Sequence, residues 1–215
     1  MSDPLPTLRH TRGAPDLLVL LPGAYMRAMD FIDAGFFATV ARRRLALDLV
    51  AVDLDLAAIS AGAALPAVHE EILAPARRQG YRKVWLGGIS LGGLLALCHA
   101  ADTPGSVDGL CLLAPYPGSR LTTAAIDRAG GLDRWQASAE ELADPEFRMW
   151  RWLQNPPAGL PIFVGYGRED RFAAGMQRIA ERVPPAARAV VPGGHEWPVW
   201  QQLWEHFLDL GHFSA

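Results

Sequence analysis

The chain has 215 residues, of which 50% are hydrophobic and 20% charged, with a formal net charge of -3. This length and composition fit a single domain spanning residues 1–215, with a large core and little room for a disordered tail. The small net charge provides no strong field for collecting nucleic acid or an anionic membrane, so we expect neither as a partner.

The first apolar runs of the chain begin a pattern that recurs to its end. Each run is rich in Val, Leu or Ile and is closed by Gly, Pro or Asp. Near-continuous apolarity, rather than alternation, predicts strands that are covered on both faces. In chain order, the predicted strands are residues 16–23, 47–54, 83–90, 109–116, 161–167 and 188–194.

Helices are predicted between these strands, because the intervening segments are long enough and several show apolar residues at helical spacing. Strand and helix in alternation predict an α/β fold, a three-layer sandwich with a mostly parallel twisted sheet and helices on both faces. In chain order, the predicted helices are residues 29–44, 66–79, 91–101, 173–183 and 197–210.

The connection formed by residues 117–158 is longer than one crossover helix needs. Within it, residues 144–153 carry apolar side chains on more than one helical face. A helix that is apolar most of the way round is covered on several sides. The segment is either a small lid-like insertion over a pocket or a crossover helix with additional packing, and the sequence leaves both alternatives open.

The two cysteines, Cys98 and Cys111, both lie in apolar runs. A disulfide framework is therefore not expected, and reduced thiols are typical of the cytosol. The first residues, MSDPLPTLRH, lack the charged-then-apolar pattern of a secretion signal. We therefore expect a cytoplasmic protein.

The stretch LGGISLGG, residues 86–93, places Ser90 where a predicted strand ends and a helix begins. Ligands bind at the carboxyl ends of the strands in an open parallel sheet. Gly88 and Gly92 lie two residues before and after Ser90, where a turn sharp enough to project the hydroxyl leaves no room for side chains. The pattern G-x-S-x-G in this context predicts a nucleophile elbow, and the alternative is a glycine-rich turn with an idle serine.

A serine hydroxyl becomes nucleophilic only when a positioned base takes its proton. His195 follows two glycines after the last predicted strand, whereas the other histidines lie in helices or near no strand end. Asp170 follows the next-to-last strand and could fix the imidazole tautomer. Alternatively, Asp170 caps the next helix. The neighbouring Glu169 is expected to be an exposed residue.

The motifs GISLGG, GREDRF and GGHEW, in the order serine, acid, histidine, resemble the α/β-hydrolase superfamily over residues 16–210. The resemblance implies an oxyanion hole made by the Leu91 N–H and by one N–H of the loop LLPGAYM. Ala24 is the donor by position, with Tyr25 as the alternative, because Pro-Gly stands where relatives often have His-Gly. Too few residues precede residue 16 for both N-terminal strands of a full-length member, so a trimmed sheet of six or seven strands is expected.

This resemblance implies a serine hydrolase that cleaves a small carboxylic ester or thioester through an acyl-enzyme on Ser90. No dinucleotide or Walker-type motif and no metal-ligand spacing occurs, so neither cofactor nor metal is expected. Tyr25, Tyr116 and Trp197 line the substrate pocket or serve as ordinary packing residues. The alternative function is a non-catalytic ligand-binding protein that retains the hydrolase fold. The oligomeric state is left open.

Overall fold

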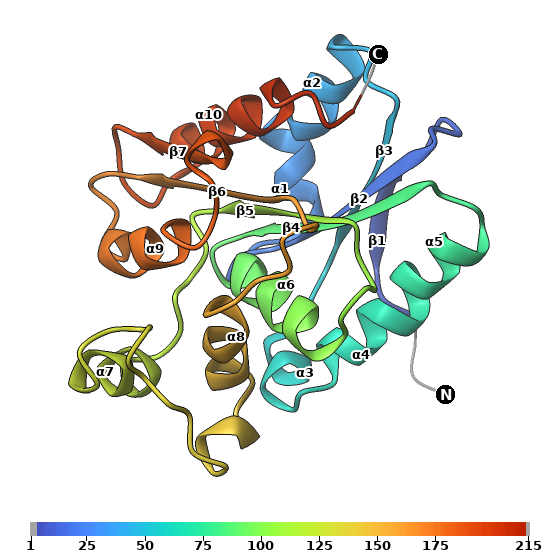
Figure 1. Ribbon diagram of the computed structural model, residues 1–215. Helices are drawn as coiled ribbons and strands as arrows, with labels where there is room; N and C mark the ends of the chain where they lie inside the picture. Colours follow the sequence, from blue (N-terminus) through green and yellow to red (C-terminus); the bar gives the residue numbers. More distant parts are fainter. Residues whose placement is uncertain (1–3, 214–215) are drawn as a thin grey trace.

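The computed structural model describes residues 4–213 and contains, within them, one seven-stranded sheet in the order β1-β3-β2-β4-β5-β6-β7 (Figure 1). Strands β2 to β7 pair in parallel, and only β1 is antiparallel, to β3. The predicted mostly parallel sheet is thereby confirmed. The strands are β1 (Thr7–His10), β2 (Asp16–Leu21), β3 (Leu47–Val52), β4 (Lys83–Ile89), β5 (Gly109–Leu113), β6 (Ile162–Gly167) and β7 (Arg188–Val191).

Helices cover both faces of this sheet, so the predicted three-layer arrangement is also confirmed. Helices α1, α2 and α10 lie on one face, and α4, α5, α6 and α9 lie on the other (Figure 1). The helices are α1 (Ala28–Asp33), α2 (Phe36–Arg42), α3 (Leu56–Ser60), α4 (Ala64–Val68), α5 (Ala74–Arg78), α6 (Leu91–Asp102), α7 (Arg120–Arg128), α8 (Pro145–Leu153), α9 (Ala173–Ala180) and α10 (Trp197–Asp209). Short turns complete them: the π-helical η1 (His69–Leu73) and the 3₁₀ turns η2 (Glu141–Ala143) and η3 (Pro185–Ala187).

Two predicted helices are interrupted in the structure, each for a local backbone reason. The helix predicted over residues 29–44 is divided into α1 and α2 at Gly35, whose φ of 81° is left-handed. The helix predicted over residues 66–79 becomes α4, η1 and α5. Pro75 has no N–H to donate to the carbonyl oxygen four residues earlier, so the regular α-helical hydrogen bonds are interrupted there. A π-helical turn precedes Pro75.

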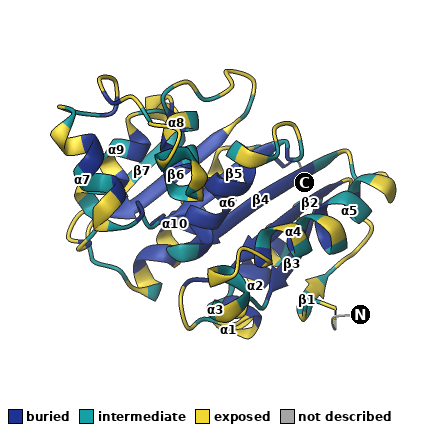
Figure 2. Cartoon of the chain, turned by 90° about the horizontal axis from the view of Figure 1, so that it is seen from below, coloured by how far each residue is buried: buried dark blue, intermediate teal, exposed yellow. Residues whose placement is uncertain are grey.

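Strands of the sheet are buried along their whole length, apart from the edge strands β1 and β7 and the first residue of β4. Figure 2 shows the strands as a dark blue layer with the exposed sides of the helices facing outward. The edge strand β1 was missed by the sequence analysis, because it is short and only partly buried. In residues 4–213, no helix combines the length and apolarity that crossing a membrane requires.

Residues 117–158 contain α7, η2 and α8, and their last helix is fixed to the core. Helix α8 packs against α6. Trp150 of α8 is fully buried, and its indole N–H donates to the Pro117 carbonyl oxygen at 2.9 Å. The segment therefore contributes one wall beside α6.

The most buried histidine of the chain lies on α6. His99 is 2% exposed, and its Nε2 lies 2.9 Å from the Ser106 hydroxyl. Burial, with a smaller contribution from the nearby His69, lowers the pKa of His99 from 6.5 to about 4. The charged form is disfavoured because the ring has little access to water.

We expect this histidine to make the fold sensitive to acid. The unfolded chain binds the His99 proton below about pH 6.5, whereas the folded chain does so only near pH 4, so the free energy of unfolding falls as the pH drops through this window. Between about pH 7 and pH 4.5, the free energy of unfolding of wild type should fall by roughly 2 kcal/mol more than that of His99→Gln, as measured by urea unfolding. Equal losses in the two proteins would contradict the assignment.

Candidate active site

Ser90 occupies a strained turn between β4 and α6. Its backbone has φ 54° and ψ -114°, outside the regions that a residue with a side chain normally adopts. A Cβ atom on Gly92 would lie 2.1 Å from the Leu21 carbonyl oxygen, and one on Gly88 would lie 2.5 Å from the Gly92 backbone. Only glycine fits at these two positions, which the sequence motif predicts.

Backbone hydrogen bonds hold this turn to the neighbouring strand and helix. The Ser90 N–H donates to the Leu113 carbonyl oxygen at 3.0 Å. The Ser90 carbonyl oxygen accepts from the N–H groups of Gly93, Leu94 and Tyr116 at 3.0, 3.1 and 2.9 Å. The strained conformation is therefore fixed on both sides, and the hydroxyl is held at the carboxyl edge of the sheet.

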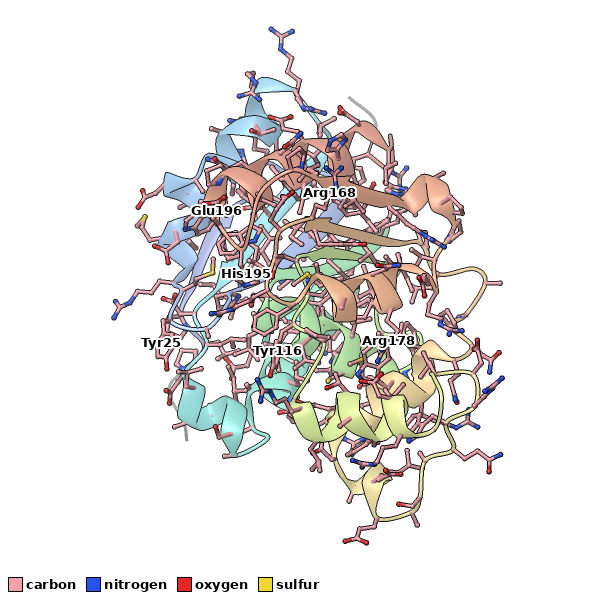
Figure 3. The ribbon with its side chains drawn as sticks, turned by 90° about the vertical axis from the view of Figure 1, so that its left-hand side faces the viewer. Tyr25, Tyr116, Arg168, Arg178, His195 and Glu196 are labelled. Atoms are coloured by element: carbon pink, nitrogen blue, oxygen red, sulfur yellow. The ribbon has the colours of Figure 1, made fainter. Side chains whose placement is uncertain are left out.

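The structure brings Ser90, His195 and Asp170 together, although they lie far apart in the sequence. The Ser90 Oγ is 2.9 Å from His195 Nε2, and His195 Nδ1 is 2.6 Å from Asp170 Oδ2. The Asp170 side chain is fully buried, and that of His195 is 16% exposed. Figure 3 labels His195 on this edge of the molecule. The three side chains form one hydrogen-bonded chain.

Asp170 also accepts hydrogen bonds in the turn that precedes α9, although Phe172 is the N-cap residue of that helix and no side chain caps it, so the alternative interpretation is met only in part. Its Oδ1 accepts the Phe172 N–H at 2.9 Å, and its backbone carbonyl oxygen accepts the Ala173 N–H. One oxygen therefore orders the start of α9 and the other holds the imidazole. The two roles are compatible, because each uses a different oxygen of the carboxylate.

The loop that carries His195 is tied down by Glu169. Glu169 Oε2 accepts the Gly193 N–H at 2.5 Å, and the Glu169 N–H donates to the Gly193 carbonyl oxygen at 3.0 Å. Glu169 is exposed, as expected from the sequence. Its role in holding the histidine loop was missed, because the pairing joins segments that the sequence separates.

Two aromatic rings enclose the His195 imidazole. Phe172 and Trp200 contact it edge-to-face, with ring centroids 5.6 and 5.2 Å from the imidazole centroid. Tyr116 packs in turn against Phe172 at 5.1 Å. The sequence analysis assigned no role to Phe172, although it ends the GREDRF motif, or to Trp200, which lies in no motif. These contacts restrict ring rotation and keep water from one side of the base.

The loop after β2 and the first turn of α6 meet next to Ser90. Leu91 is the first residue of α6, so its N–H has no acceptor within the helix. The loop after β2 packs against this end of the helix, because the missing side chain of Gly92 leaves room for the Leu21 and Pro22 backbone. Gly23 lies against Ser90, since a Cβ built on Gly23 would be 3.5 Å from the Ser90 Cβ.

The conformation of that loop leaves both proposed donors available. The Met26 N–H donates to the Gly23 carbonyl oxygen at 3.1 Å, which closes a turn with Ala24 and Tyr25 at its centre, and Tyr25 has a φ of 63°. Within residues 4–213, neither Ala24 nor Tyr25 donates its backbone N–H to a protein acceptor. Both amides therefore stay candidates for the second oxyanion donor that the sequence predicts.

The three predicted pocket residues have different surroundings. Tyr116 is half-buried beside Phe172, and burial raises the pKa of its hydroxyl. Trp197 is half-buried and packs edge-to-face against Phe36. Tyr25 is 91% exposed and borders a hollow along α3 and α4. Figure 3 labels both tyrosines together with His195.

A metal-dependent arrangement has no support in the described part of the chain. Within residues 4–213, no group of three or more His, Cys, Asp or Glu side chains is placed to hold a metal ion. The candidate site itself contains a hydroxyl, an imidazole and a carboxylate in one hydrogen-bonded chain.

Comparison with known proteins finds similarity in structure only: no family model and no curated protein matches the sequence. A substrate-bound fluorophosphonate-binding serine hydrolase F of Staphylococcus aureus is 11% identical, with a TM-score of 0.67 over 97% of this chain and 99% of that one. A thermophilic esterase from Thermogutta terrifontis is 16% identical, with a TM-score of 0.60 over 96% and 93%. A monoacylglycerol lipase of Paleococcus ferrophilus is 15% identical, with a TM-score of 0.57 over 94% and 99%.

The sheet order, the strand-turn-helix at Ser90 and these similarities identify the architecture. The protein has the α/β-hydrolase fold, as the sequence motifs indicated. The sheet has seven strands, within the expected range.

The turn at Ser90 generates a prediction about two glycines. Gly92→Ala should lower the free energy of unfolding by about 2 kcal/mol, because the new Cβ would overlap the Leu21 carbonyl oxygen. Gly159→Ala is the matched control, since nothing lies within 4 Å of its Cβ position, and it should change stability by less than about 0.5 kcal/mol. Chemical denaturation measures both, and equal stabilities would argue against the close approach.

Proposed function

We propose that the protein is a serine hydrolase that cleaves a small carboxylic ester or thioester through an acyl-enzyme on Ser90. The observation that carries this proposal is the hydrogen-bonded chain from the Ser90 Oγ through the His195 imidazole to the buried Asp170 carboxylate. A hydroxyl, a base and an oriented acid in this order are the groups that acyl transfer requires. The strained turn under Ser90 adds support.

In the first half of the reaction, His195 Nε2 takes the proton of Ser90 as Oγ attacks the acyl carbon. Asp170 accepts the hydrogen bond from Nδ1–H, fixes the tautomer and stabilises the imidazolium. The N–H groups of Leu91 and Ala24, with Tyr25 as the alternative to Ala24, stabilise the oxyanion. One such donor typically lowers the barrier by about 3 kcal/mol. His195 then returns the proton to the leaving alcohol or thiol.

In the second half, His195 takes a proton from a water molecule, which attacks the acyl carbon of the ester on Ser90. The carbonyl–Oγ bond breaks, the proton passes to Oγ, and the carboxylic acid leaves. No cofactor takes part in either half. The three similar structures bear the names serine hydrolase, esterase and lipase, which supports an ester as the substrate.

The leaving group distinguishes an ester from a thioester. In the proposed mechanism the leaving atom receives its proton from His195 in both cases, so the same groups can act on either substrate. Parallel assays with matched p-nitrophenyl esters and thioesters of one acid compare the two substrates directly.

Removing the nucleophile tests the proposal. Ser90→Ala should abolish ester turnover, because it removes the hydroxyl that attacks the acyl carbon, and it should leave the unfolding transition in place. Wild type should react covalently with a fluorophosphonate probe at Ser90, as located by mass spectrometry, and Ser90→Ala should not. Absence of both labelling and turnover in wild type would favour the non-catalytic ligand-binding protein instead.

Neutralising the buried acid gives a graded result. Asp170→Asn should lower kcat on the order of 10⁴-fold with little change in KM, because the amide no longer stabilises the imidazolium. Asp33→Asn, an exposed acid on α1, is the control and should have wild-type kinetics. A loss of less than about tenfold in Asp170→Asn would refute its assignment as the third member.

A further inference from the structure

A cavity of about 640 Å³ lies along α6, the helix that begins directly after Ser90. We call it the α6 groove. Residues of α3, α4 and η1 line one side, residues of α8 line the other, and α6 forms the floor. Figure 1 shows α6 between α8 and α3. The volume falls within the range of small-molecule sites, and the proposed reaction assigns no role to it.

The floor of the α6 groove is an apolar stripe that starts at the proposed nucleophile. Leu91, Leu94, Leu95 and Cys98 line it at helical spacing, so they share one face of α6. Leu91 supplies an oxyanion N–H from its backbone, and its side chain lines the start of the groove. The apolar floor therefore begins at the residue that follows Ser90 in the chain.

One wall of the α6 groove is mainly aliphatic, although Glu70 on that side and Glu146 on the α8 side also line the cavity. The side facing α6 is lined by Ile59, Ala64, Leu65 and Pro66. Among the described residues that line the groove, the only rings other than proline are the imidazoles of His69 and His99. Aromatic ligands usually gain from stacking on aromatic side chains, which are missing here. The lining therefore suits a flexible hydrocarbon chain.

Polar groups line the opposite end of the α6 groove. Asp102 accepts two hydrogen bonds from Arg148 of α8, at 2.6 and 2.8 Å. His99 is bonded to Ser106, and the Nδ1 of His69 is buried without a hydrogen-bond partner in the described chain. A hydrocarbon that reached the partly exposed pair of Asp102 and Arg148 would remove these charges from water without replacing their hydration. The apolar part of the groove therefore ends near Cys98.

We propose that the α6 groove binds the aliphatic chain of the acyl group, and that it selects chains of medium length. This inference rests on the proposed serine hydrolase function. From Leu91 to Cys98 the helix rises about 10 Å. A fully extended hydrocarbon advances ~1.3 Å per carbon–carbon bond, so about eight carbons fill the apolar part.

Helix α8 has a defined role in this proposal. Pro145, Glu146 and Arg148 of α8 close one side of the groove. Trp150 anchors the same helix through its hydrogen bond to Pro117. The segment 117–158 thus supplies a fixed wall that sets the width of the chain-binding site.

The experiment compares p-nitrophenyl esters with acyl chains from two to sixteen carbons. For wild type, kcat/KM should rise by at least about tenfold from acetyl to octanoyl and fall for chains well beyond ten carbons. Leu95→Trp, on the floor, and Leu65→Trp, on the facing wall, should each lower the octanoyl-to-acetyl ratio about tenfold. Because the ratio is measured within one preparation, any unfolded fraction of a variant cancels. Leu210→Trp, on an exposed position beyond α10, is the matched control and should keep the wild-type ratio.

Binding of octanoic acid to Ser90→Ala, measured by calorimetry, separates this proposal from the proposed function. If Ser90→Ala binds octanoic acid and adding Leu95→Trp weakens this binding about tenfold, the α6 groove is supported. If wild type then hydrolyses no ester, only the esterase proposal fails. Rapid hydrolysis with the same chain-length profile in wild type, Leu95→Trp and Leu65→Trp overturns the groove and leaves the esterase standing. If octanoic acid does not bind and the octanoyl-to-acetyl ratios of the variants equal that of wild type, the groove proposal is likewise overturned.

Discussion

The close approach between the loop after β2 and the first turn of α6 is the constraint on which the site depends. Without a side chain at Gly92, the Leu21 carbonyl can touch α6, and Ser90 can turn through a left-handed conformation. Such strain costs on the order of 1–3 kcal/mol and persists only where the surroundings fix it. The four backbone hydrogen bonds of Ser90 provide that fixation. The same contact brings the Leu91 amide beside the loop that carries Ala24.

His195 is held by contacts of a different kind, because it lies on a loop after the edge strand β7. The buried carboxylate of Asp170 orients its Nδ1, and Phe172 and Trp200 enclose the ring. Glu169 fixes the loop backbone through Gly193. A ring so restrained loses little further freedom when it takes a proton, which is the arrangement that acyl transfer needs.

Helix α6 connects the proposed chemistry with the proposed specificity. Its first residue, Leu91, carries a proposed oxyanion N–H, and the apolar stripe from Leu91 to Cys98 forms the floor of the groove. The polar pair of Asp102 and Arg148 limits the apolar length. In this proposal, one helix therefore positions the nucleophile and limits the substrate length, and the anchored α8 supplies the wall opposite α3 and α4.

The sequence by itself determined the order of most strands and helices, because apolar runs are local. It also indicated that Ser90, Asp170 and His195 lie at one edge of the sheet, because parallel strands bring their carboxyl ends together. It did not predict the break at Gly35, the π turn before Pro75 or the short edge strand β1, since backbone conformation and pairing decide these. Only the tertiary structure placed Phe172 and Trp200 on the imidazole and opened the groove along α6. Such contacts join residues distant in the chain, and no local pattern encodes them.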